Sequence, residues 1–209
     1  MRFTTRLLAA LTAAAVLPAA VLPAAAAAAA PPPKVTVDLV KASGTGCGGL
    51  PGTQQPSVGN LPDGTGIFLR YAGLVASYPG PGDWRDRTCS TVLRFTYPPG
   101  ITIALHRSLF VGYVKVKGTA DATFLANFRF ANGTPQGTAR AGFKDATDKT
   151  WSLPHSTSNI IFAPCEGTVD VVVDQTVTVS GSGNAEAILS MNYAEHRAQT
   201  ELYLETQTC

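Results

Sequence analysis

The chain has 209 residues, with 16 lysines and arginines against 14 aspartates and glutamates. Two of the basic residues, Arg2 and Arg6, belong to an apolar N-terminal leader, and without them 14 basic residues balance 14 acidic ones. A neutral mature chain without a lysine or arginine cluster argues against nucleic acid as a partner.

Residues 1–30 have the pattern of a secretory signal peptide. A basic start is followed by the apolar, alanine-rich segment Leu7–Ala30, which ends in small residues. Retention as a membrane anchor is the alternative, but two prolines interrupt the segment and no positive flank follows it. We therefore expect residues 31–209 to be secreted as an extracellular domain without stable membrane insertion.

Apolar and polar residues alternate along most of the mature chain, and no helical period is sustained. Between Ala120 and Phe130, for example, the even positions are apolar while Asp121 and Asn127 are among the odd ones. In chain order, the alternating runs are 35–39, 67–71, 93–97, 101–105, 120–130, 169–179, 187–193 and 202–204. Turn sequences such as Asn132-Gly133 separate them. The pattern predicts an all-β fold, a single antiparallel β-sandwich or barrel-like domain of about eight to ten strands.

The segment Ser43–Gly66 interrupts this regularity. It contains eight glycines and three prolines, which predicts a long loop within the domain, held in place at Cys47.

Four cysteines in an oxidising compartment predict two disulfide bonds. Pairing neighbours along the chain joins Cys47 to Cys89 and Cys165 to Cys209, and it ties the loop and the C-terminus to strand starts. We favour this pairing, although the sequence alone leaves the other two pairings open. A zinc site is disfavoured because the chain has no C-x-x-C motif.

Several short motifs resemble those of a known family. They are Ser43-Gly44-Thr45-Gly46-Cys47, Arg87-Thr88-Cys89, Tyr97-Pro98-Pro99-Gly100, Phe110-Val111-Gly112-Tyr113, Ala163-Pro164-Cys165 and the C-terminal Cys209. Over about residues 40–209 the chain resembles a domain-of-unknown-function family of small secreted proteins of high-GC bacteria and fungi. The resemblance implies secretion and two disulfides, and it implies no established activity. The chain departs from the family's Trp-Arg-x-Cys finish, because Glu205 to Thr208 precede the last cysteine.

Catalytic and metal-binding motifs are weak. There is no G-x-S-x-G motif, and a Ser/His/Asp triad would have to assemble from distant residues. The isolated candidate bases are His106, His155 and His196, and the acid pairs spaced by three are Asp83/Asp86 and Asp145/Asp148. Turn aspartates explain these pairs better than a calcium site does. We predict no catalytic residues, no metal and no cofactor.

One loop is the best candidate for binding. Trp84 lies in a glycine- and proline-rich stretch between Tyr78 and the charged residues Arg85 and Arg87. An exposed aromatic ring there could stack on a sugar or anchor a partner. The interpretation that we favour for Trp84 itself is structural: it folds back over the open end of the sandwich and covers the core beside Cys89. Trp151, in contrast, is predicted to lie in the core or to plug one end of the barrel.

These observations favour a secreted, non-enzymatic module with a binding or structural role at or outside the cell surface. Its expected partners are extracellular polysaccharide, cell-wall material or a secreted protein. The alternatives are a secreted hydrolase with a non-sequential active site and an inhibitor of extracellular hydrolases, for which the Tyr78–Arg87 loop would be the inhibitory segment.

Overall fold

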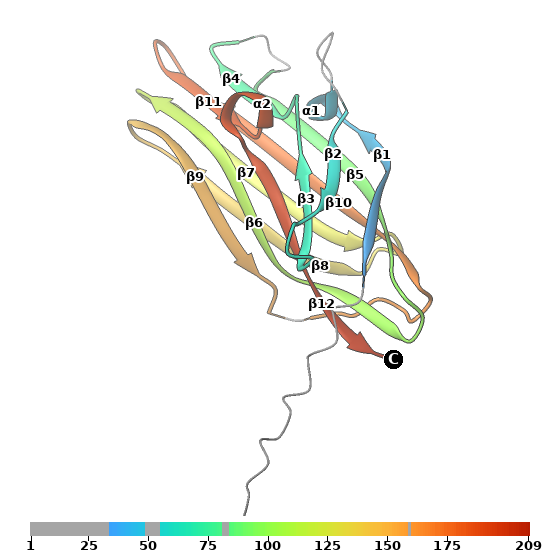
Figure 1. Ribbon diagram of the computed structural model, residues 1–209. Coiled ribbons are helices and arrows are strands. Elements are labelled where there is room, and N and C mark those ends of the chain that lie inside the picture. The colour runs from blue at the N-terminus through green and yellow to red at the C-terminus, as the bar shows by residue number, and fades with distance from the viewer. Residues whose placement is uncertain (1–33, 49–54, 81–83, 159) are drawn as a thin grey trace, which may run out of the picture. The chain divides into compact units, whose positions relative to one another are not determined.

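The computed structural model describes residues 34–48, 55–80, 84–158 and 160–209 (Figure 1). All of them belong to one compact unit, Pro32–Cys209. Two antiparallel β-sheets pack as a sandwich, which confirms the predicted fold class. The predicted leader lies outside the described residues. Within the described ranges, no helix has the length and apolar character needed to cross a membrane.

The smaller sheet has five strands. In spatial order they are β1 (Thr36–Ser43), β5 (Asp86–Thr96), β10 (Thr168–Ser180), β7 (Asp121–Phe130) and β8 (Pro135–Phe143).

The larger sheet has seven strands. In spatial order they are β2 (Ser57–Asn60), β3 (Gly66–Arg70), β12 (Gln199–Thr208), β6 (Ile101–Lys117), β11 (Glu186–Ser190) and β4 (Val75–Tyr78), with β9 (Thr147–Ser156) also paired to β6. Residues 107–111 of β6 pair with both β12 and β9, so these two strands flank β6 on opposite sides. β8 and β9 therefore each pair with a single neighbour among the described strands, one in each sheet.

The buried core lies on the side of the strands that the alternation of apolar and polar residues predicts. In β7 the even residues are buried, and Phe124 and Phe128 pack against Phe110 of β6 in the other sheet, with ring centroids 4.9 and 5.8 Å apart. Trp151 of β9 is also buried and lies 5.2 Å from the ring of Phe124. Its indole occupies the space above Gly112, where a Cβ atom would lie 2.6 Å away. These aromatic residues join the two sheets into one core.

The disulfide bonds differ in their surroundings. Cys47 pairs with Cys89 in the buried interior, and Cys165 pairs with Cys209 at an exposed position. The structure thus contains the favoured pairing.

The segment Ser43–Gly66 is not a loop throughout. Its described part contains the short helix α1 (Thr45–Gly48), which presents Cys47 to Cys89, and the strand β2, which pairs with β3. A four-residue strand is too short to show alternation in the sequence, and so the prediction missed it.

Other strand boundaries also differ from the predicted ones, and the described residues form twelve strands, more than predicted. The run 101–105 continues to Lys117, because a bulge at His106 changes the phase of the alternation without ending the strand. The run 187–193 ends at Ser190, and Tyr193 instead begins the second helix, α2 (Tyr193–His196). β9 was not predicted, since an edge strand that is polar on most positions carries little periodicity.

Candidate functional site

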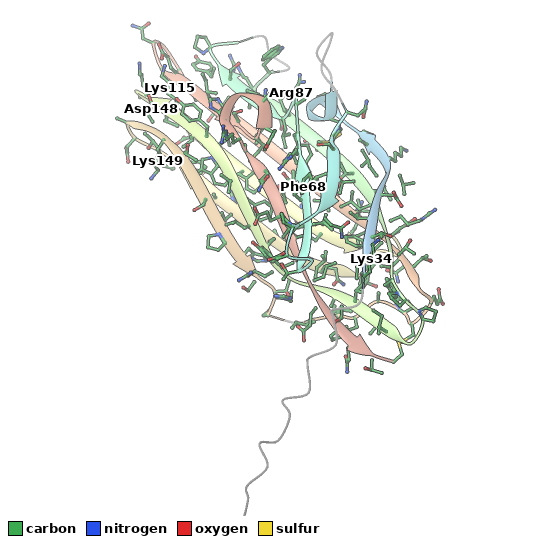
Figure 2. All side chains as sticks on the ribbon, viewed as in Figure 1. Lys34, Phe68, Arg87, Lys115, Asp148 and Lys149 are labelled. Carbon is green, nitrogen blue, oxygen red and sulfur yellow. A yellow bond between two sulfur atoms is a disulfide. The ribbon has the colours of Figure 1, made fainter. Side chains whose placement is uncertain are left out.

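The loop predicted to bind a partner directs its charges to its own aromatic rings. The Cζ atom of Arg85 lies 4.7 Å from the centre of the Tyr78 ring, and that of Arg87 lies 5.6 Å from the Trp84 ring. Arg87 is only 4% exposed and belongs to strand β5 (Figure 2). Its guanidinium therefore packs locally, and a binding role for this loop remains a prediction.

The three histidines lie on different elements, namely β6, β9 and α2. In the described ranges, no cluster of three or more His, Cys, Asp or Glu side chains could hold a metal ion. His155 lies directly opposite Ser108 in the β6–β9 pair, but Ser108 Oγ and His155 Nε2 have no hydrogen-bond partner. A catalytic triad needs that hydrogen bond and an acid behind the histidine.

A different group of side chains lies on the outer surface of the larger sheet. Antiparallel pairing aligns outward residues of neighbouring strands in rows. Glu201 of β12 lies between Phe68 of β3 and Leu109 of β6, and Tyr203 lies beside Arg107. We call this surface the aromatic face; it comprises Phe68, Arg70, Arg107, Tyr113, Tyr193, Gln199, Glu201 and Tyr203.

Arginines stack on the rings of this face. The Cζ atom of Arg70 lies 4.1 Å from the centre of the Phe68 ring and 3.9 Å from that of Tyr193. Arg107 lies 4.0 Å from the ring of Tyr203. These distances are those of cation–π contacts, which hold a long side chain in one orientation. The guanidinium groups are thus oriented while remaining at the surface.

A line of hydrogen bonds connects the polar groups. Arg70 Nε donates to Gln199 Oε1 at 3.2 Å, and Gln199 Nε2 donates to Glu201 Oε1 at 2.6 Å. The hydroxyl of Tyr203 donates to Glu201 Oε2 at 2.5 Å. Four side chains from two strands are therefore linked in sequence across the face.

Local structure places each member of this line. Gln199, Glu201 and Tyr203 alternate along β12, so all three point outward. Tyr193 reaches the face because an isolated bridge joins Tyr71 to Asn192 and sets α2 beside the end of β3. Gly59 of β2 leaves room for the Phe68 ring, since a Cβ atom at this position would lie 2.7 Å from Phe68 Cζ.

The electrostatics of the face favour neutral tyrosine hydroxyls. The hydrogen bond to Glu201 raises the pKa of Tyr203, and partial burial and the carboxylate charge raise it further. Tyr113, which stacks on His196 with centroids 4.3 Å apart, donates to Asp148 at 2.7 Å, and this bond raises its pKa. Both hydroxyls remain protonated donors at neutral pH.

The chemistry available here is recognition of a polar, ring-containing ligand. A guanidinium has five N–H donors and a carboxylate has about four acceptor positions. The hydrogen bonds described above use one donor of Arg70 and two acceptor positions of Glu201. The face is thus pre-oriented and keeps hydrogen-bonding capacity toward solvent.

Sequence reasoning missed this face, although a signal was present. Phe68 and Arg70 alternate on one strand, and Gln199, Glu201 and Tyr203 alternate on another. Such planar polar and aromatic side chains on the wet side of a strand differ from the threonines and aspartates of ordinary surface strands.

Comparison with known families and structures gives a clear family assignment. The model of a family described as a domain of unknown function (DUF4360) matches residues 33–209, and the chain belongs to this family. No curated protein matches the chain significantly.

Among solved structures, similarity is remote. The enzymatically active domain of bacteriophage CBA120 tailspike protein 4 is 15% identical over 81% of this chain, with a TM-score of 0.29, and the chain spans 19% of its length. TmCBM61 in complex with β-1,4-galactotriose is 8% identical over 80% of this chain and 88% of that chain, with a TM-score of 0.30. A family 11 carbohydrate-binding module from Clostridium thermocellum, in complex with a β-1,3-1,4-mixed-linked tetrasaccharide, is 12% identical over 81% and 88%, with a TM-score of 0.22. TM-scores from 0.22 to 0.30 carry no inference about function.

Proposed function

We propose that this member of the DUF4360 family is a secreted, non-enzymatic module that binds polysaccharide outside the cell through its aromatic face. The basic, apolar leader supports export, and the two disulfide bonds are compatible with it. The host is expected among high-GC bacteria and fungi, as the family resemblance implies.

The observation that carries the proposal is the line of linked, outward side chains from Arg70 to Tyr203. Sugars present apolar ring faces together with several hydroxyl groups. Aromatic rings pack against apolar surface, and planar amide, carboxylate and guanidinium groups each bond to neighbouring hydroxyls. Because stacking and hydrogen bonding hold the side chains in advance, little side-chain entropy is lost on binding.

Charge and apolar exposure disfavour the other classes of partner. The face has two arginines against Glu201, and the mature chain has no formal net charge, so phosphate-driven binding of nucleic acid is not favoured. The exposed large hydrophobic side chains of the described residues are Val40, Ile160 and Ile161, and none belongs to this face. The core of a protein–protein interface is normally more apolar than this.

The test is binding of the purified mature chain to insoluble cellulose, chitin, xylan, mixed-linked β-glucan and peptidoglycan, measured by depletion from solution. We expect saturable binding to at least one of these materials. Arg70→Ala and Tyr203→Ala should each weaken it, whereas Arg94→Ala, a matched change on the opposite sheet, should not. If no material is bound, or if all three variants bind as the unmodified chain does, the proposal is wrong.

The same samples separate this proposal from the hydrolase alternative. Release of reducing sugars or muropeptides into the supernatant would show turnover. We expect none, because the residues that define the aromatic face include one carboxylate, Glu201, whereas most glycosidases require two, on opposite sides of the scissile bond.

A further inference from the structure

The two arginines of the aromatic face, Arg70 and Arg107, are held by rings and not by carboxylates. Their guanidinium groups stack on Phe68, Tyr193 and Tyr203. Neither forms an ion pair with any described residue. In that part of the chain, the cations that do form ion pairs are Arg94, Lys115, Lys117, Arg129 and Lys144. The two charges of the face are therefore fixed in position without being neutralised.

Both guanidinium groups keep free N–H donors toward solvent. Arg70 donates through Nε to Gln199, so its two Nη atoms have no acceptor among the described residues. Arg107 donates no hydrogen bond within the same part of the chain. None of these nitrogen atoms is among the buried polar atoms that lack a partner, so solvent reaches them.

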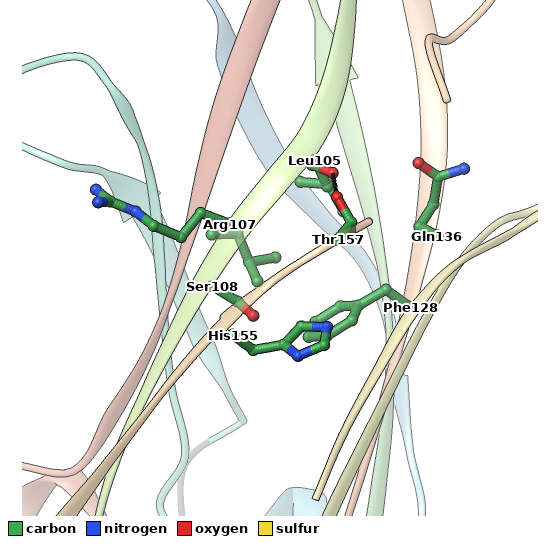
Figure 3. Close-up of a pocket in the computed structure, with 8 residues that line it drawn as sticks. Leu105, Arg107, Ser108, Phe128, Gln136, His155 and Thr157 are labelled. Atoms are coloured by element: carbon green, nitrogen blue, oxygen red, sulfur yellow. Dashed lines mark hydrogen bonds between the residues drawn. The ribbon is translucent and has the colours of Figure 1, made fainter. Parts of the chain in front are cut away.

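Arg107 extends outward from the larger sheet. It is exposed, whereas the next residue, Ser108, is buried, as alternation along β6 requires. Figure 3 shows the Arg107 side chain directed away from Ser108 and His155, which line a small cavity between the sheets. The guanidinium of Arg107 thus belongs to the outer surface, beside the Tyr203 ring.

Arg94, on the opposite sheet, shows which chemical group fits a free guanidinium edge. Its Nε and Nη2 atoms donate to the two oxygens of Asp170, each at 2.8 Å. A guanidinium edge and a carboxylate match in this way because two parallel N–H groups meet two oxygens. Arg70 retains one such edge, formed by its two Nη atoms, and Arg107 retains both of its edges.

The carboxylates near these arginines are bonded to other groups. Glu201 accepts hydrogen bonds from Gln199 and Tyr203. Asp63, in the turn before β3, accepts hydrogen bonds from the backbone N–H and the hydroxyl of Thr65, at 3.0 and 2.8 Å. The protein itself therefore supplies no carboxylate to either guanidinium edge.

A neutral ligand would cover these charges without compensating them. Removing a charged group from water costs free energy unless the group gains a partner of opposite charge. A carboxylate on the ligand offsets this cost and adds charge-assisted hydrogen bonds, which are stronger than those to a neutral hydroxyl.

The spacing of the two arginines fits an extended ligand. Arg70 lies beside Gln199 on one side of β12, and Arg107 lies opposite Tyr203 on the other side. Four residues along a strand and two strand spacings place their Cα atoms about 16 Å apart. A single sugar is too short to reach both, whereas an extended polysaccharide chain reaches both through different residues.

We infer that the polysaccharide bound by the aromatic face is acidic, and that carboxylates of its uronic acid residues bind Arg70 and Arg107. This inference rests on the proposed function and names the class of its ligand. The rings of the face pack against the sugar rings, and Glu201 accepts hydrogen bonds from hydroxyl groups between the two carboxylates.

The test compares two forms of one polymer. The mature chain is titrated with cellulose and with cellulose in which a fraction of the primary hydroxyl groups has been oxidised to carboxylates. The dissociation constant should be about tenfold lower for the oxidised form, as expected for a hydrogen bond to a charged group. Raising the NaCl concentration from about 50 to about 500 mM should remove most of this preference, because salt screens exposed charges.

Variants locate the preference on the face. Arg70→Gln and Arg107→Gln should each reduce it and leave the weaker binding to unmodified cellulose in place. Arg140→Gln is the matched control. It removes the same charge from an exposed arginine of β8, on the opposite sheet, that has no ion pair among the described residues. This variant should keep the full preference.

The outcomes separate this inference from the proposed function. Equal affinity for the two forms of cellulose, or a preference that salt does not change, would overturn the inference and leave the proposed function intact. A preference that Arg140→Gln lowers as much as the two face variants do would reflect overall charge and would also overturn it. Binding to no polysaccharide, oxidised or not, would refute the proposed function itself.

Discussion

The two outer surfaces of this sandwich are built from the same alternating strands but carry different chemistry. On the smaller sheet, the outward charges pair with each other, as in Arg94 with Asp170 at 2.8 Å and Arg129 with Asp174 at 3.2 Å. Asn127 likewise accepts a hydrogen bond from Thr138. We call this surface the salt-bridged face.

On the aromatic face, by contrast, arginines contact rings as well as acceptors. Arg94 uses two N–H groups on the two oxygens of one carboxylate, so acid and base satisfy each other. Arg70 gives Nε to an amide and lies between two rings. Charges that neutralise each other keep a surface hydrated, whereas charges held by stacking keep their hydrogen bonds available to a ligand. A nearby aromatic ring does not by itself make an arginine available to a ligand. Arg87 also lies close to an aromatic ring, but it is buried.

The largest expected effect concerns the core that both faces share. Phe128→Ala should lower the free energy of unfolding by about 3–5 kcal/mol, because it removes a buried ring that packs against Phe110. Asn127→Ala, one residue away on the salt-bridged face, should cost less than about 1 kcal/mol. Urea denaturation measures both, and equal losses would mean that the faces of β7 are assigned wrongly.

The next prediction contrasts matched arginines. Arg70→Ala should weaken polysaccharide binding by about 30-fold, corresponding to about 2 kcal/mol, the loss typical of an interface hot spot. Arg94→Ala should leave the affinity within about twofold, because that side chain lies on the opposite sheet. Isothermal titration with a soluble fragment of the bound polysaccharide measures the two affinities. A larger loss of affinity for Arg94→Ala than for Arg70→Ala would place the binding site on the salt-bridged face instead of the aromatic face.

The two faces are expected to lose stability at opposite ends of the pH range. The hydrogen bonds from Arg94 lower the pKa of Asp170, so its contribution to stability is present above the ordinary aspartate pKa and is lost as the pH falls through the folded value. The pKa of Tyr203 is raised instead, so its contribution is present below the ordinary tyrosine pKa and is lost as the pH rises through the folded value.

NMR measures these two pKa values directly. Arg94→Ala should move the pKa of Asp170 up toward its ordinary value, and Glu201→Gln should move the pKa of Tyr203 down. A change of either pKa in the variant of the opposite face would contradict the separation.

The smallest expected effect is the energy of a surface ion pair. A double-mutant cycle on Arg94 and Asp170 should give a coupling free energy of about 0.2–1 kcal/mol, because the arginine side chain is 51% exposed. A coupling well above this range would show that the salt-bridged face contributes more to stability than a hydrated surface can.

Much of the fold could be predicted from residues close in sequence. Strict alternation identified which side of β7 is buried, and Asn132-Gly133 marked the β7–β8 turn, where Gly133 adopts a φ of 91°. Alternation works because successive side chains of a strand point to opposite faces. Gln175 is an exception. It is fully buried on the valine side of β10 and donates to Thr200 of the other sheet at 2.8 Å.

The candidate binding surface could not be predicted from the sequence, because it forms only when the strands assemble into sheets. Phe68, Arg107 and Tyr203 are far apart in the chain, and only the order β3–β12–β6 makes them neighbours. The bulges at His106 and Gln136 were not predictable either, because a bulge inserts one residue without changing the composition of a strand. The sequence by itself determined that this protein is a disulfide-bonded β-sandwich, because periodicity and cysteine content are local properties. Only the tertiary structure decided which outward residues act together, because strand order and register are set by packing between distant segments.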